Sequence, residues 1–149
     1  MKSSRQVYNL ALLLTLIGIV MFGACSEDVN DKLPQTISSF VNKYYPNSPV
    51  SSFSESKGGE YTVVIRNGAV LQFNSDMAWT SINGNGVPLP PMMIMDECPD
   101  PLYRYIEEME RTSGVYALSR TDKIYRVEFL DTYITYTIAT GQVTYPQTT

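Results

Sequence analysis

The stretch that decides the fold runs from Pro34 to Trp79 and reads PQTISSFVNKYYPNSPVSSFSESKGGEYTVVIRNGAVLQFNSDMAW. Its first part has apolar residues at the i, i+3, i+4, i+7 spacing of one helix face, namely Ile37, Phe40, Val41 and Tyr44. Its second part alternates as a half-buried strand does, with one face formed by Tyr61, Val63 and Ile65. The stretch therefore predicts a helix followed by a meander of antiparallel strands.

A second copy of this pattern follows. The helix spacing recurs 65 residues later at Leu102, Tyr105, Ile106 and Met109. After one deleted residue, the strand positions recur 64 residues later as Tyr125, Val127 and Phe129. Self-similarity of this kind predicts two tandem helix-plus-meander repeats, at residues 33–82 and 98–149, with a connector at residues 83–97.

Local signals give the expected element boundaries. Prolines at the first turn and after the last turn predict a helix over residues 34–45, and a second helix is expected over residues 101–112, capped by Asp100 and followed by Gly114 in a left-handed conformation. Asn67 and Gly68 predict a two-residue hairpin turn. Strands are expected at 50–56, 60–66, 69–73, 78–82, 115–120, 124–130, 133–139 and 141–145. The predicted fold class is α+β, with one antiparallel sheet and two helices packed on one face.

The first 24 residues have the pattern of a secretory signal. Lys2 and Arg5 precede an almost entirely apolar run that is short for a membrane span of about 20 residues. The segment FGAC at 22–25 resembles the lipobox of bacterial lipoproteins. This resemblance implies a lipoprotein signal peptide at 1–24, an acylated N-terminus at Cys25 and a lipidated tether at 25–32. An uncleaved anchor helix is the alternative.

The residues after Cys25 bear on localisation. Ser26, Glu27 and Asp28 resemble the acidic tag that sends lipoproteins of the Bacteroidetes type to the outer-membrane surface, and a solvated tether explains them equally well. The expected localisation is the bacterial cell envelope, as an outer-membrane lipoprotein that is periplasmic or surface-exposed. The membrane contact is the N-terminal lipid.

Composition excludes several classes of function. The chain has a formal net charge of −4, and without residues 1–24 its Lys and Arg fall from 11 to 9 against 15 acids, which disfavours nucleic acid as a partner. The sequence contains no histidine, so Ser-His-Asp triads and histidine-containing zinc sites are excluded. With Cys25 assigned to lipid, Cys98 has no cysteine to pair with. We find no catalytic residue, metal site or cofactor motif, and a carboxylate-dependent enzyme is the least favoured alternative.

Two groups of residues in or next to the connector each have two interpretations. The acids Asp96, Glu97 and Asp100 lack the regular ligand spacing of a calcium loop, and helix capping explains them more simply. The apolar run at 92–95, Met-Met-Ile-Met, either packs over the core or forms an exposed docking patch.

Several punctuating residues of the first repeat resemble the PepSY-like, or β-lactamase-inhibitor-like, repeat of small envelope proteins. They are Leu33, Pro34, Ile37, Tyr45, Pro46, Asn67, Gly68, Phe73, Asn74 and Trp79. Met77 stands where this family usually has glycine, and the second copy matches less closely. The resemblance implies paired repeats that form one sheet with helices on its back, no cofactor and no catalytic residue.

Strand alternation separates a core face from an open face of the sheet. The candidate binding residues on the open face are Arg66, Arg126, Glu128, Tyr133 and Thr135. Arg and Tyr are enriched in binding hot spots, so we expect a non-catalytic module that binds an envelope protein or peptide there. A plain solvated face and a glycan-binding or surface accessory lipoprotein remain alternatives.

Overall fold

The computed structural model describes residues 29–146 of the chain. The predicted signal peptide and Cys25 lie outside the described residues. The elements are η1 (Val29–Lys32), α2 (Gln35–Tyr44), β1 (Val50–Glu55), β2 (Tyr61–Ile65), β3 (Val70–Phe73), β4 (Trp79–Asn83), α3 (Pro91–Glu97), α4 (Asp100–Glu108), η2 (Thr112–Gly114), β5 (Ala117–Arg120), β6 (Ile124–Glu128), β7 (Tyr133–Thr137) and β8 (Gln142–Thr144). No helix in this part of the chain combines the length and apolar character needed to cross a membrane.

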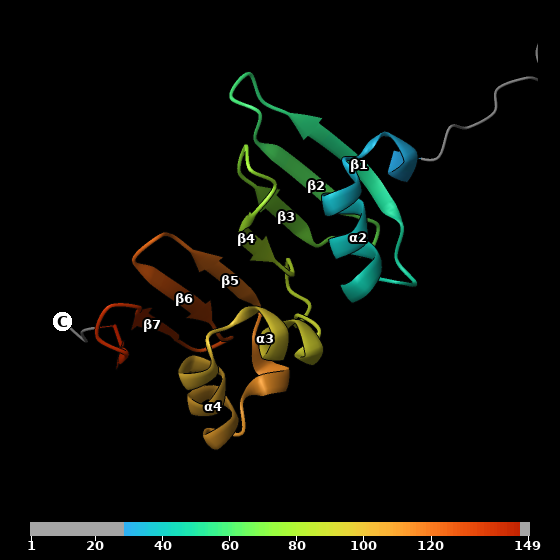
Figure 1. Cartoon of the computed structure of the whole chain (residues 1–149). Helices are drawn as coiled ribbons and strands as arrows, with labels where there is room; N and C mark the ends of the chain where they lie inside the picture. Colours follow the sequence, from blue (N-terminus) through green and yellow to red (C-terminus); the bar gives the residue numbers. More distant parts are fainter. Residues whose placement is uncertain (1–28, 147–149) are drawn as a thin grey trace, which may run out of the picture.

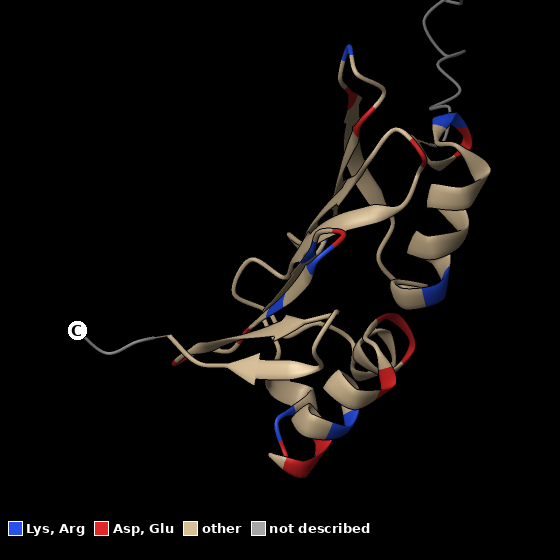
Figure 2. Cartoon of the chain, turned by 60° about the vertical axis from the view of Figure 1, so that its left-hand side comes forward, with Lys and Arg blue, Asp and Glu red and all other residues tan. Residues whose placement is uncertain are grey.

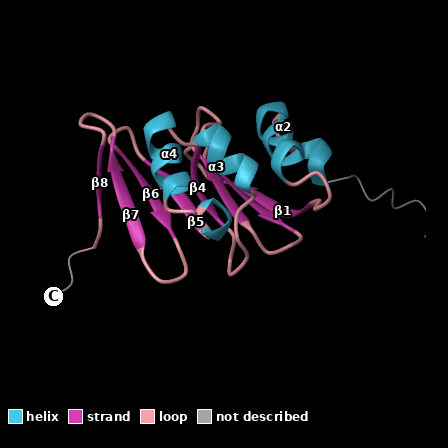
Figure 3. Cartoon of the chain, turned by 90° about the horizontal axis from the view of Figure 1, so that it is seen from below, coloured by secondary structure: helices cyan, strands magenta, loops and turns pink. Residues whose placement is uncertain are grey.

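All eight strands form one antiparallel sheet, in which strands adjacent in sequence are also adjacent in space. Helix α2 precedes the first four strands, and α3 with α4 precedes the last four (Figure 1). The helices lie on one face of the sheet and leave the other face open (Figure 3). The sheet turns between β4 and β5, so the two halves face different directions (Figure 2). The predicted α+β class, with one sheet and helices on one face, is confirmed.

The core lies between the sheet and the helices, as the spacing predicts. Ile37 and Val41 of α2, and Leu102 and Ile106 of α4, are at most 1% exposed. The strand side of this core is formed by buried residues of the sheet, among them Val63, Ile65, Leu71, Ile82, Leu118, Val127 and Ile134. One buried cluster contains residues from both halves.

The helix spacing also predicts equivalent core positions for Phe40 and Tyr105, but neither residue is fully buried. Both are partly buried and pack against the cluster from its margin. Phe40 meets Tyr44 and Phe73 edge-on, with ring centroids 4.8 and 5.5 Å apart. Phe40 and Tyr105 are each three residues after the first apolar residue of their helix, at the edge of the apolar face. A large ring there touches the core without being enclosed by it.

The connector contains a helix that the sequence analysis did not predict. Pro91 occupies the first turn of α3, where its missing N–H removes no helical hydrogen bond. Met93 and Ile94 are fully buried, whereas Met92 and Met95 are 47% and 51% exposed. Both interpretations of the Met-Met-Ile-Met run are thus partly right, because one side of the helix packs on the core and the other faces solvent.

One predicted hairpin turn and both predicted ends of the second helix differ in detail from the structure. The Asn67–Gly68 hairpin has a three-residue loop, since Ile65 N donates to Ala69 O and Gly68, at φ 100°, lies in the left-handed region. Asp100 lies in the first turn of α4 but makes no capping hydrogen bond. The left-handed residue after α4 is Glu110, at φ 56°, and not Gly114.

Candidate functional site on the open face of the sheet

The strand register aligns one outward-facing residue of every strand into a row across the open face. Neighbouring strands lie about 4.8 Å apart, so the side chains of such a row form a continuous strip. We call this strip the polar row; it consists of Ser54, Thr62, Gln72, Ser81, Ser119, Arg126, Thr135 and Thr144. Seven of its eight members are uncharged.

Four of the five predicted face residues lie together on β6 and β7. Arg126 pairs with Thr135 and Glu128 pairs with Tyr133 across the two strands. The Arg126 guanidinium carbon lies 3.6 Å from the centroid of the Tyr133 ring, and Arg126 Nε donates to Glu128 Oε1 at 2.9 Å. We call these four residues the Arg126 cluster. Stacking and ion pairing fix the orientation of the arginine while its side chain stays 41% exposed.

Arg66 is not part of this cluster. It follows the end of β2 and is exposed, and strands β3, β4 and β5 lie between β2 and β6. Alternation along one strand predicts which face of the sheet a residue lies on, but the lateral distance between residues of different strands depends on the strand order of the whole sheet. The lipidation residue, Cys25, lies outside the described residues.

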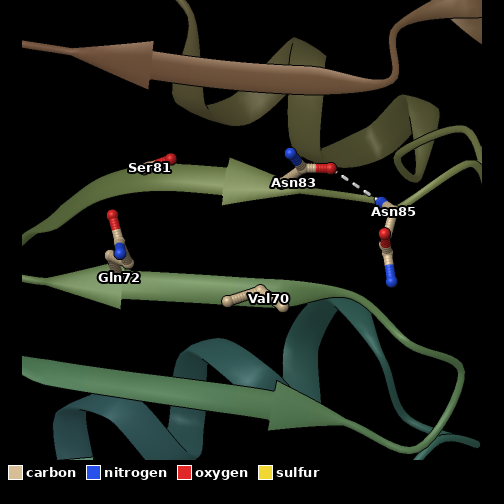
Figure 4. A pocket seen from close by; sticks show the side chains of 5 residues that line it. All are labelled: Val70, Gln72, Ser81, Asn83 and Asn85. Carbon is tan, nitrogen blue, oxygen red and sulfur yellow. Dashed lines mark hydrogen bonds between the residues drawn. The ribbon is translucent and has the colours of Figure 1, made fainter.

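A pocket on β3 and β4 contains residues that the sequence analysis did not single out. Its lining consists of Val70, Gln72, Ser81, Asn83 and Asn85, and its volume is about 310 Å³ (Figure 4). We call it the amide pocket. The signal in the sequence is the Asn83-Gly-Asn-Gly run, which we had assigned only to the connector.

The two acids at the end of the connector, Asp96 and Glu97, link three elements. Glu97, at the end of α3, accepts from Tyr44 Oη of α2 at 2.5 Å and from Trp79 Nε1 of β4 at 2.7 Å. Asp96 pairs with Lys43 at 2.9 Å, and this ion pair lowers the pKa of Asp96. Capping of the second helix is therefore the wrong explanation for these two acids, which end α3 and bind side chains from distant parts of the chain.

The Cys98 thiol and the acid Asp100 are the other candidate reactive or metal-binding groups. Burial raises the pKa of the Cys98 thiol to about 12, which keeps the thiol protonated and unreactive at neutral pH. Within residues 29–146, no three His, Cys, Asp or Glu side chains gather closely enough to hold a metal ion. Asp100 is 3.4 Å from Arg104 rather than beside Asp96 and Glu97 as a ligand set would require.

No protein-family model and no curated protein matches this sequence. Several solved structures share the fold, and three of them are described below. A candidate periplasmic protein of the DUF2874 family from Bacteroides vulgatus has a TM-score of 0.67 at 20% identity, with 79% of this chain and 93% of that chain covered. A candidate calcium-regulated periplasmic protein from Bacteroides thetaiotaomicron has a TM-score of 0.66 at 18% identity, with the same coverage.

The third structure is a candidate periplasmic protein of unknown function from Bacteroides vulgatus. Its TM-score is 0.61 at 18% identity, with 78% of this chain and 94% of that chain covered. At such identities the likeness shows a common fold, and function has to be argued from the site.

Proposed function

We propose that this chain is a lipid-anchored protein of the bacterial cell envelope, carried on the outer membrane by acylated Cys25. The N-terminal pattern supports this, since a charged start, an apolar run and FGAC precede the folded domain. Three structures that share its fold are described as candidate periplasmic proteins. Met77 supports the PepSY-like resemblance, because its φ of 61° suits the glycine that this family usually has there.

The role we propose is non-catalytic binding of an envelope protein or peptide, and the Arg126 cluster carries this proposal. A planar guanidinium stacked on a phenol ring offers contact area and hydrogen-bond donors in one fixed orientation. A preordered anchor loses little side-chain entropy when it binds. The cluster belongs to β6 and β7, on the face of the sheet that no helix covers (Figure 3).

Crosslinking in intact cells tests the binding role. Arg126→Ala and Tyr133→Ala should each weaken capture of a partner by about 2 kcal/mol, the threshold of a hot spot. Gln35→Ala, an exposed change on α2, is the control and should leave capture unchanged. If the partner is recovered equally from all variants while each keeps its melting temperature, the Arg126 cluster is not the binding site.

The mass of membrane-purified protein tests the anchor. We expect a mature chain that begins at Cys25 and carries the added mass of its acyl chains. A chain that still begins at Met1, or an unmodified Cys25 in the native host, would contradict the lipoprotein assignment.

A further inference from the structure

The open face is divided by charge. The outward residues of β2, β3 and β4 are Thr62, Val64, Val70, Gln72, Ser81 and Asn83, none of them charged. The other half carries the Arg126–Glu128 pair. Strands β2 to β4 therefore present an uncharged surface, with the exposed Arg66 only at the end of β2, whereas β6 carries an ion pair. The two halves suit different ligands.

The amide pocket lies within this uncharged half. Its lining combines the amides of Gln72 and Asn83 and the hydroxyl of Ser81 with the apolar side chain of Val70; Gln72 and Val70 come from β3, and Ser81 and Asn83 come from β4 (Figure 4). At about 310 Å³ it is as large as the smaller ligand sites of proteins.

Asn85 lies at one end of the pocket. Its backbone has φ 52°, and its N–H donates to Asn83 Oδ1 at 2.7 Å. The side chain turns from the end of β4 toward the β2–β3 hairpin, where its Nδ2 lies 3.7 Å from the Cβ position of Gly68 (Figure 4). Left-handed conformations of non-glycine residues cluster at binding sites.

The amides that face the pocket are available to a ligand. Among residues 29–146, the side chains of Gln72 and Asn85 make no hydrogen bond within the protein. The side-chain oxygen of Asn83 already accepts a hydrogen bond from the backbone N–H of Asn85. Each free amide presents two donor hydrogens and an acceptor oxygen side by side. That pattern matches hydroxyl groups, which donate and accept at the same atom.

We propose that the amide pocket binds a neutral, hydroxyl-rich glycan, with one sugar unit over Val70 and the chain continuing along Thr62, Gln72, Ser81 and Ser119 of the polar row. An added peptide strand is a poorer fit, because β3 and β4 are central strands whose main-chain groups are already paired. This proposal does not depend on the protein-binding role, since the two sites share no residue.

Isothermal titration calorimetry on the full chain in detergent tests the proposal. The probes are the neutral hexasaccharides mannohexaose, maltohexaose, cellohexaose and laminarihexaose, with hexagalacturonate as a charged probe of equal length. We expect saturable binding of at least one neutral hexasaccharide, weaker binding of its monosaccharide and none of hexagalacturonate. Failure of all four neutral probes, or preference for hexagalacturonate, would overturn the proposal.

Variants locate the binding. Gln72→Ala and Asn85→Gly should each weaken hexasaccharide binding about three- to tenfold, the loss expected for one hydrogen bond. Asn85→Gly is compatible with the left-handed backbone, so the fold is preserved. Gln35→Ala matches Gln72→Ala on the opposite side of the molecule and should bind as wild type. Equal affinity in all these variants, or displacement of the sugar by unstructured peptides, would place no glycan site here.

Discussion

Glu97 is the residue at which three distant segments meet. Its two carboxylate oxygens accept separate hydrogen bonds, one from Tyr44 and one from Trp79. Both donors belong to residues less than 5% exposed, so removal of the carboxylate leaves the Trp79 N–H without its protein partner in a mostly buried place. A carboxylate at the C-terminal end of α3 opposes the helix dipole, and these two donors offset that cost.

We expect Glu97→Ala to lower the free energy of unfolding by about 1–3 kcal/mol, because the Trp79 N–H is left buried and unpaired. Glu97→Gln should cost less than half as much, since its oxygen still accepts from Trp79 and the Tyr44 hydroxyl can turn toward Asp96, 3.3 Å away. Urea denaturation measures both. Exposed Glu108→Ala is the control, expected within about 0.5 kcal/mol of wild type. Equal losses in all three would show that Glu97 is not a special contact.

Tyr45 offers a stabilising change. Its hydroxyl is buried and finds no hydrogen-bond partner among the described residues, and burial raises its pKa to about 12. We expect Tyr45→Phe to raise the free energy of unfolding by about 1 kcal/mol at pH 7. In the wild type, the unfolded chain loses this proton first, so stability should fall as pH rises above about 10.

Urea midpoints at pH 7 and pH 11 check this. The difference between the two midpoints should shrink in Tyr45→Phe. A midpoint that falls at pH 7 would show that the hydroxyl contributes a bond we have not recognised.

At the scale of elements, α4 ends in a Schellman motif with an unusual residue. Glu110 N donates to Glu107 O at 2.8 Å and Arg111 N donates to Ile106 O at 3.1 Å. The left-handed position of this motif normally has glycine, and Glu110 occupies it at φ 56°. The glycine of this segment, Gly114, lies four residues later, so its identity alone predicted the wrong end for the helix.

We expect Glu110→Gly to stabilise the protein, by about 0.5–1 kcal/mol, because glycine has no Cβ to strain the left-handed backbone. Gly114→Ala should also stabilise, by about 0.4–1 kcal/mol, since nothing lies within 4 Å of its Cβ position. Thermal unfolding of the two single variants and the double variant measures both effects. If the helix instead ends at Gly114, Gly114→Ala destabilises and Glu110→Gly does not stabilise.

Helices and strands with a clear hydrophobic period could be predicted from the sequence. Short elements, and contacts between segments far apart in the chain, could not. The stripes of α2 and α4 and the alternation of β2 and β6 identify their buried faces directly. Helix α3 has only seven residues after a proline-rich run, so its period is too short to see. Its partners through Glu97 come from residues 18 and 53 positions away, a distance at which sequence patterns carry no contact information.

The same limit applies to the site. Alternation places Arg126 and Tyr133 on the open face, and a single hairpin brings them together, so this part was within reach of the sequence. The distance of Arg66 from the Arg126 cluster follows from the strand order β1 to β8. The amide pocket follows from the pairing of β3 with β4 and from the turn at Asn85. These features appear only at the scale of the whole sheet.

At the scale of the whole molecule, the two halves meet at the β4–β5 ladder. Ile82 pairs with Leu118 there, and both are fully buried. Arg120 of β5 stacks over the Trp79 ring at 4.0 Å and donates to Trp79 O at 2.8 Å. Trp79, the single tryptophan of the chain, is therefore a natural fluorescent probe of the junction.

Because one sheet and one buried cluster span both halves, we expect a single cooperative unfolding transition. Trp79 fluorescence and far-UV circular dichroism should give the same urea midpoint. Leu118→Ala should cost about 2–5 kcal/mol and shift both signals together, since the cavity opens at the interface of the halves. If the repeats instead fold independently, circular dichroism shows two steps, and the variant moves only the step that includes β5.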